Sequence, residues 1–141
     1  MRIEELRYDR VSVIKIIGEL DAGNLPDAGE VVDGNFKGLR SRLVFNVEDI
    51  PIVTSTAISF FIDTAKRARE FDGDAVLSAP TDLLRKSLQI LDLHKFFLIF
   101  DDDDAAIAHF AEADLDDTVV PGNATPPAPD WREKFRFWKK G

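Results

Sequence analysis

Residues 42–61 read RLVFNVEDIPIVTSTAISFF, in which a short apolar strand pattern runs into three consecutive hydroxyl residues and then into a helical pattern. This order predicts a β-strand followed by a helix, with Thr54, Ser55 and Thr56 at the helix N-terminus. The unpaired N–H groups and the positive dipole end of a helix N-terminus favour phosphate, so one of these hydroxyl groups is a candidate phosphoacceptor. Serine and threonine are also ordinary N-cap residues, and a purely structural role stays open at this point.

The rest of the chain alternates strand and helix patterns around this segment. Strands are predicted over residues 3–8, 11–17, 43–47, 75–78 and 97–100, and helices over residues 25–36, 57–70, 81–93 and from 101 to about 110. A short polar turn joins the first two strands, which is typical of a hairpin, whereas helices separate the later strands and predict right-handed crossovers between parallel strands. The fold class is therefore α/β, with a mixed sheet of four or five strands and helices mainly on one face.

Local signals mark the starts of two of these helices. Asn24 is the expected cap of the helix over residues 25–36, which Gly29 and Gly34 interrupt. Thr81 is expected to open the helix over residues 81–93. The apolar side of that later helix is expected to carry Leu84, Leu88 and Leu91.

Four features stand in a characteristic order along the chain. Residues 18–21 (GELD) close an alternating strand, a second apolar strand begins at Leu43, the hydroxyl triplet follows, and residues 91–97 lead into another apolar strand. In that order the chain resembles the STAS family, the small domains of anti-sigma-factor antagonists. The family pattern places Asp-Ser-Ser-Gly at the start of the helix, and the resemblance aligns those four positions with residues 54–57 without a gap. It covers roughly residues 11–110 and implies the STAS architecture and strand order.

The resemblance also identifies two departures from the family pattern. The acidic residue ahead of the hydroxyl pair is Thr54 here, and the aspartate that often stands in the preceding strand is Asn46. Carboxylates near the acceptor can orient a hydroxyl group or a kinase's metal ion, so their absence is expected to affect phosphorylation more than partner binding. A third change, from glycine to Ala57, is milder because alanine is a good helix former.

The resemblance implies a regulatory binding module that is switched by phosphorylation of the second hydroxyl residue, Thr56, with Thr54 and Ser55 as its neighbours. The implied partner is an anti-sigma factor or a serine/threonine protein kinase of histidine-kinase-like fold. A phosphate would add up to two negative charges to the docking surface and would disfavour association. The residues expected to contact the partner are Asp21, Asn24, Ala57 and Ser59.

Two other functions stay open. Stand-alone STAS proteins also serve as accessory subunits of lipid-trafficking ABC transporters, and the geometry of a helix N-terminus would suit a small anionic ligand or a nucleotide. An enzyme is not expected, because the chain has no cysteine, no glycine-rich phosphate loop and no recognisable catalytic triad. No cofactor is predicted.

Composition narrows the class of protein further. The chain has 141 residues, 45% hydrophobic content and a net charge of −8, which suits a single domain and disfavours direct binding to nucleic acid. The N-terminus is charged and no run of about 20 apolar residues occurs, so neither a signal peptide nor a membrane span is expected and the predicted location is the cytoplasm. The four aspartates at residues 101–104 are interpreted as a helix first turn and not as a metal site. His94 and His109 are assigned packing or surface roles.

The C-terminal part differs in composition from the rest. We expect a STAS-like domain over residues 1–113, an acidic and proline-rich linker over residues 114–129, and a basic aromatic segment over residues 130–141. The last segment carries five basic and two acidic residues. As a helix it would place Trp131, Phe135 and Trp138 on one face. We expect it to dock on this chain or on a second copy, while a partner-binding role stays equally open; the sequence also leaves a homodimer open.

Overall fold

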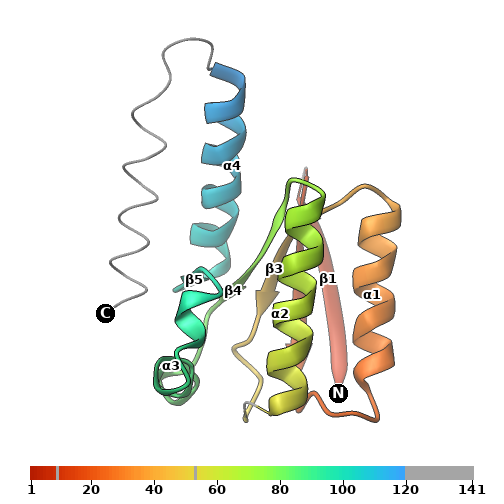
Figure 1. The fold of residues 1–141 in the computed structure, drawn as a ribbon, viewed down its shortest axis with the longest axis vertical. Helices are drawn as coiled ribbons and strands as arrows, with labels where there is room; N and C mark the ends of the chain where they lie inside the picture. Colours follow the sequence, from red (N-terminus) through yellow and green to blue (C-terminus); the bar gives the residue numbers. More distant parts are fainter. Residues whose placement is uncertain (9, 53, 120–141) are drawn as a thin grey trace.

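The computed structural model describes residues 1–8, 10–52 and 54–119, and the fold in this part of the chain is a five-stranded sheet with helices on both faces (Figure 1). The elements are β1 (Arg2–Tyr8), β2 (Val11–Ile17), α1 (Leu25–Lys37), β3 (Arg42–Asn46), α2 (Ser55–Glu70), β4 (Asp74–Ser78), α3 (Asp82–Ile90), a 3-10 turn (Leu93–Lys95), β5 (Ile99–Phe100) and α4 (Asp103–Val119). The sheet order is β1-β2-β3-β4-β5. Strand β1 is antiparallel to β2, and all other neighbours are parallel. The α/β class, the hairpin and the mixed sheet predicted from sequence are confirmed.

The strand order explains why three helices share one face. Each step from β2 to β5 moves to the next strand through a helix, and right-handed crossovers made in one direction place α1, α2 and α3 on the same side. Their buried side chains join those of the strands in one large apolar core around Phe45, Phe61 and Leu77. This arrangement matches the expectation of helices mainly on one face.

Helix α4 covers the opposite face. Ala106 and Phe110 from α4 pack on a smaller apolar cluster that includes Val13, Val44 and Val76. The alternation of strand side chains produces the two clusters, since neighbouring residues such as Val44 and Phe45 point to opposite faces. Within the described residues, no helix is long and apolar enough to cross a membrane.

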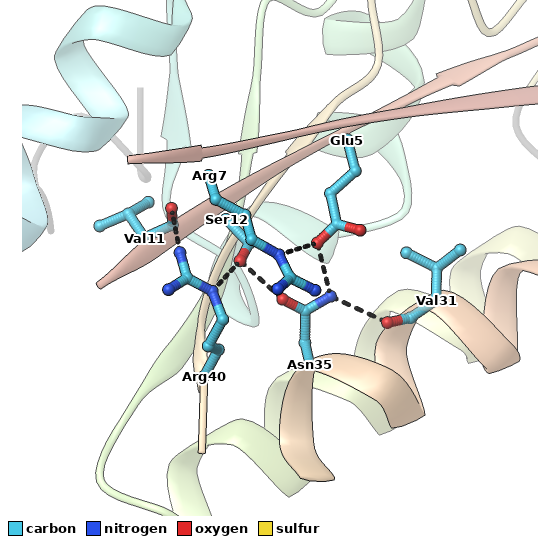
Figure 2. A network of polar contacts seen from close by, with 7 residues as sticks. All are labelled: Glu5, Arg7, Val11, Ser12, Val31, Asn35 and Arg40. Carbon is cyan, nitrogen blue, oxygen red and sulfur yellow. Dashed lines mark hydrogen bonds and ion pairs between the residues drawn. The ribbon is translucent and has the colours of Figure 1, made fainter. Parts of the chain in front are cut away.

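A polar network fixes the β1–β2 hairpin onto the end of α1 (Figure 2). Asn35 of α1 donates from Nδ2 to Glu5 and to the Val31 carbonyl, and its Oδ1 accepts a hydrogen bond of 2.6 Å from the Ser12 hydroxyl. Arg40 donates to Ser12 Oγ and to the carbonyl of Val11. Ser12 and Asn35 are both fully buried, so each polar group would cost free energy if it lost its partner.

The ends of two helices differ from the prediction. Helix α3 ends at Ile90 and not at residue 93, because Asp92 takes a left-handed conformation with φ of 58° and a short 3-10 turn follows. Helix α4 does not end near Phe110 but continues to Val119. It therefore crosses the expected domain boundary at residue 113 and includes the first six residues of the expected linker. The linker from residue 120 and the basic aromatic segment at residues 130–141 lie outside the described residues.

The start of α1 also corrects a sequence prediction. Asn24 occupies the N-cap position, but its side chain makes no capping hydrogen bond. Gly29 and Gly34 lie inside an unbroken helix, although they were expected to interrupt it. On α3, Leu84 and Leu88 are buried as predicted, whereas Leu91 is half exposed because the helix has ended.

Candidate functional site

The hydroxyl triplet lies at the N-terminus of α2, as predicted. Thr54 is the N-cap residue, and its Oγ1 accepts a hydrogen bond of 3.0 Å from the Ala57 N–H. The same hydroxyl group donates to the carbonyl of Leu20 at 2.8 Å. Thr54 therefore caps the helix and also fastens it to the loop that precedes α1.

That loop, residues 18–25, has a fixed internal structure. Asp21 Oδ1 accepts hydrogen bonds from the N–H groups of Gly23 and Asn24, and the Asn24 side chain accepts from the Asp21 N–H and donates to the Glu19 carbonyl. Gly18 opens the loop with φ of 106°, a region that favours glycine. Asp21 and Asn24 thus shape the loop that stands beside the N-terminus of α2.

A second connection holds the loop from the side of β3. The Gly18 N–H donates to the Asp49 carbonyl at 3.0 Å. Lys15 Nζ lies 3.2 Å from the Asp49 carboxylate. The hydrogen bond to Asp49 raises the pKa of the Lys15 ammonium above its usual value, with further help from Glu48. The segment that leads from β3 to α2 and the segment that leads from β2 to α1 therefore form one connected surface.

A groove of about 470 Å³ runs between α1 and α2 from this surface. Thr56, Ser59 and Asp63 line it from α2, and Leu25 and Gly29 line it from α1. The ion pair between Arg67 and Asp33, at 2.8 Å, joins the two helices further along the groove.

Three of the residues that the sequence selected, Ser55, Thr56 and Ser59, line the groove, while Asp21 and Asn24 belong to the loop at residues 18–25. Thr56 is half-buried, Ser59 and Asp21 are exposed, and Asn24 is half-buried. Ala57, however, was expected to contact a partner and is only 1% exposed, because its side chain packs into the core beneath the helix. The Ala57 side chain is therefore not accessible on the free surface of the domain.

The three hydroxyl groups differ in their surroundings. Thr54 caps the helix, and Ser55 is exposed at the first helical position. Within the described residues, the side chains of Ser55 and Thr56 make no hydrogen bond, and both open onto the groove. They are therefore the two hydroxyl groups that a reacting molecule can reach.

Asn46 lies on the other side of the sheet. Its Nδ2 donates to Asp103 Oδ1 at 3.0 Å, and its Oδ1 accepts from the Glu48 N–H. Ser78 donates to the same oxygen of Asp103 at 2.6 Å. The side chain of Asn46 therefore belongs to the contact between the sheet and α4, and a carboxylate at this position would face Asp103 and not Thr56.

The run of aspartates at residues 101–104 has separate structural uses. Asp101 pairs with Arg85 at 2.8 Å, and Asp102 accepts a hydrogen bond from the Ala105 N–H at the start of α4. Within the described residues, no group of three or more potential ligands is placed to hold a metal ion. His109 is buried and its ring packs at a tilt against the rings of Phe100 and Phe110, in agreement with a packing role.

Sequence reasoning missed two parts of this end of the molecule. It did not identify the groove, although Thr56, Ser59 and Asp63 follow helical spacing and could have indicated a shared face. It also missed an exposed apolar surface on α3, where Leu83 is 68% exposed and Ile90 is 81% exposed. In Figure 1, α3 and the N-terminus of α2 lie at the same end of the sheet.

Comparisons with known proteins agree with this geometry. The STAS domain model matches residues 2–106, and the chain belongs to the STAS family. The anti-sigma-B factor antagonist of Staphylococcus aureus (strain NCTC 8325 / PS 47) is 24% identical over 93 residues, which cover 66% of this chain and 86% of that protein.

Two solved structures have the same fold. An anti-sigma factor antagonist from Mycobacterium paratuberculosis aligns with a TM-score of 0.68 and 18% identity over 77% of this chain and 92% of that chain. The Bacillus cell fate determinant SpoIIAA in its phosphorylated form aligns with a TM-score of 0.61 and 19% identity over 77% of this chain and 99% of that chain. The resemblance to anti-sigma-factor antagonists and the predicted STAS fold are confirmed.

Proposed function

We propose that this chain is a partner-switching module that docks an anti-sigma factor, or a serine/threonine protein kinase of histidine-kinase-like fold, on the surface formed by residues 18–25 and the first turns of α2. The observation that carries the proposal is the pair of bonds made by Thr54 Oγ1, which joins the loop and the helix into one surface. Thr56 opens onto the groove in that surface. Similarity to the S. aureus anti-sigma-B factor antagonist supports the choice of partner.

Phosphorylation of Thr56 is the switch in this proposal. The hydroxyl group stands in the first turn of α2, where free N–H groups and the helix dipole favour an added phosphate. Thr54 is less suited to be the acceptor, because modification would break both of its hydrogen bonds. Thr56 is preferred over Ser55 because it occupies the acceptor position of the family pattern, and the phosphorylated form of the structural relative SpoIIAA supports such a modification.

The charges near Thr56 explain how a phosphate would release a partner. Asp63 lines the same groove, and Asp21 is exposed on the adjacent loop. Arg67, a basic residue of the groove, is already paired with Asp33. A phosphate would add negative charge to an acidic surface and would have to lose its hydration shell on docking, so both effects weaken the complex.

Mass spectrometry of the protein after treatment with its cognate kinase tests the acceptor. We expect phosphate on Thr56, and the Thr56→Ala variant should not be modified. The matched control is Thr81→Ala, which removes the capping threonine of α3 and should leave the modification unchanged. Phosphate that persists in the Thr56→Ala protein and maps to Ser55 or Thr54 would contradict the assignment.

A pull-down from the source cell tests the partner and the switch together. The wild-type protein should capture an ATPase of histidine-kinase-like fold, and Thr56→Glu should weaken that complex by about 1 to 3 kcal/mol. The Thr81→Glu variant places the same charge at another helix N-terminus and should bind as the wild type does. Capture of an ABC permease in place of the ATPase, or equal binding by Thr56→Glu, would refute the proposal.

A further inference from the structure

Among the described residues, none covers an apolar strip that runs along β1 on the α4 side of the sheet. Leu6 is 57% exposed and Tyr8 is 47% exposed. Their partners across the hairpin are Val13 and Val11, which are buried members of the cluster beneath α4. Because directly opposed residues of an antiparallel pair share a face, Leu6 and Tyr8 extend that cluster beyond its cover.

The strip is open because one helix cannot span five strands. Helix α4 packs across β2, β3, β4 and β5, whereas the other face of the sheet has three helices. All residues of β1 except Ile3 are exposed. A seven-residue edge strand with an exposed leucine and tyrosine is a feature that proteins usually cover.

We propose that the basic aromatic segment, residues 130–141, covers this strip and lies beside α4, with Trp131, Phe135 and Trp138 packed on Leu6 and Tyr8. This inference is independent of the proposed function, since the strip and the Thr56 surface lie on different faces of the sheet. It commits to an intramolecular contact within one chain.

The position of the end of α4 supports this occupant. Asp103 at the start of α4 bonds to Asn46 and Ser78 at the carboxyl ends of their strands, so α4 runs toward the opposite end of the sheet and extends past it (Figure 1). The turn between Tyr8 and Val11 lies at that same end, by the direction of β2. Residues 120–129, which include four prolines, can span about 30 Å if extended, enough to return to the middle of β1.

The dimensions of the two surfaces are compatible. Leu6 and Tyr8 are two residues apart on a strand, which separates their Cα atoms by about 7 Å. Residues 131 and 138 would be about 10 Å apart along a helix. Three aromatic side chains at spacings of four and three can therefore cover both exposed side chains at once.

Charge favours this side of the molecule over the apolar surface of α3. Helix α4 has no lysine or arginine. Its acidic residues are Asp103, Asp104, Glu112, Asp114, Asp116 and Asp117. The segment at residues 130–141 carries a net charge of +3, from five basic and two acidic residues. Aspartates near a helix C-terminus oppose the helix dipole, and a basic segment beside α4 would offset this effect. Helix α3 offers no such acidic surface, since Lys86 and Arg85 lie between its exposed Leu83 and Ile90.

Tryptophan fluorescence of the full-length protein tests the proposal directly, because both tryptophans of the chain are Trp131 and Trp138. We expect acrylamide to quench the full chain several-fold less than the free peptide of residues 130–141. Leu6→Lys and Tyr8→Lys should each raise quenching toward the peptide value. Ile90→Lys, which changes a still more exposed apolar residue on α3, is the control and should leave quenching unchanged.

The quenching results distinguish the C-terminal segment of the same chain from other molecules that could cover the strip. Quenching as fast in the full chain as in the peptide, or protection that is lost in Ile90→Lys and retained in Leu6→Lys, would overturn the proposal. Protection that disappears on dilution, together with a dimer mass by sedimentation, would assign the strip to a second copy of the chain and would also overturn it. Because Leu6 and Tyr8 are exposed on an edge strand, both variants are expected to fold, and circular dichroism checks this.

Discussion

The contact between Asn46 and Asp103 gives the sharpest prediction about the energetics of this domain. Asn46 is 5% exposed, and its amide donates to Asp103 Oδ1 at 3.0 Å. The Asn46→Asp variant restores the residue that the STAS pattern often has in this strand. It would also place two carboxylates about 3 Å apart, a distance estimated from the bond that it replaces.

The Asn46→Asp variant loses free energy of unfolding, and the upper bound of this loss depends on pH. The pair can avoid repulsion by binding one proton, and holding a proton at pH 7 on an aspartic acid with an ordinary pKa of about 3.9 costs about 4 kcal/mol. Loss of a hydrogen bond to a charged group costs about 1.5 to 3 kcal/mol. We therefore expect the free energy of unfolding of the variant to be about 3 kcal/mol lower than that of the wild type at pH 7. At pH 5 the bound falls to about 1.5 kcal/mol.

The direction of the pKa shift of the introduced carboxyl group determines how the loss of stability depends on pH. A neighbouring carboxylate and burial raise the folded-state pKa of the introduced carboxyl group above its unfolded value. The penalty is then present at pH values above the folded-state pKa and disappears as the pH falls through it, since the protonated group can donate as the amide does. Urea unfolding at pH 7 and pH 5, each referred to the wild type at the same pH, measures the difference.

A double variant provides the control. Asn46→Asp combined with Asp103→Asn exchanges the amide and the carboxylate and should recover most of the lost stability at pH 7. Combining Asn46→Asp with Asp104→Asn removes an exposed neighbouring charge and should recover little. An equal loss at both pH values, or equal rescue by the two second changes, would show that the proposed repulsion is not the cause.

Three further predictions concern the backbone around the site and the sheet, and urea unfolding checks each one. Thr54→Ala should destabilise the domain by about 2 kcal/mol because it loses both a cap and the bond to Leu20, whereas Thr54→Ser should retain most of the stability; equal stability of the two variants would contradict the assigned bonds. Leu39→Gly should stabilise the domain by about 0.5 kcal/mol, since residue 39 has φ of 63° and its side chain is 90% exposed. A loss of stability would show that the Leu39 side chain makes contacts that stabilise the fold. Gly73→Ala should cost about 3 kcal/mol, because the added Cβ would lie 2.0 Å from the Ser41 carbonyl oxygen, and a neutral effect would mean that the turn can move.

The sheet could be predicted from sequence because its side chains follow simple periods. Strand β3 is apolar on both faces and β2 nearly so, as covered strands require, and the predicted ranges agree with the structure to within two residues. The end of α3 could not be predicted in the same way. The apolar pattern continues through Leu91 and Leu93, but Asp92 between them adopts a left-handed conformation that ends the helix.

The candidate site was predicted where it depends on local sequence and missed where it depends on distant backbone. Thr54, Ser55 and Thr56 could be placed at a helix N-terminus because capping is a local property. Which of them caps, and which opens onto the groove, depends on the carbonyl of Leu20, thirty-four residues away along the chain. A backbone carbonyl carries no sequence signal, so this bond appears only in the three-dimensional structure.

The two departures from the STAS pattern have a common explanation in the structure. Thr54 and Asn46 both stand where the family pattern has a carboxylate, and both donate a hydrogen bond that a carboxylate cannot donate. Thr54 donates to the Leu20 carbonyl, which holds the loop beside α2, and Asn46 donates to Asp103, which holds α4 on the sheet. Each replacement therefore serves the architecture of this chain. Asn46 faces Asp103 on the α4 side of the sheet, so of the two missing carboxylates only the one at residue 54 would stand at the α2 N-terminus beside Thr56, the proposed acceptor. The proposed docking surface keeps exposed acidic residues, among them Asp21 and Asp63.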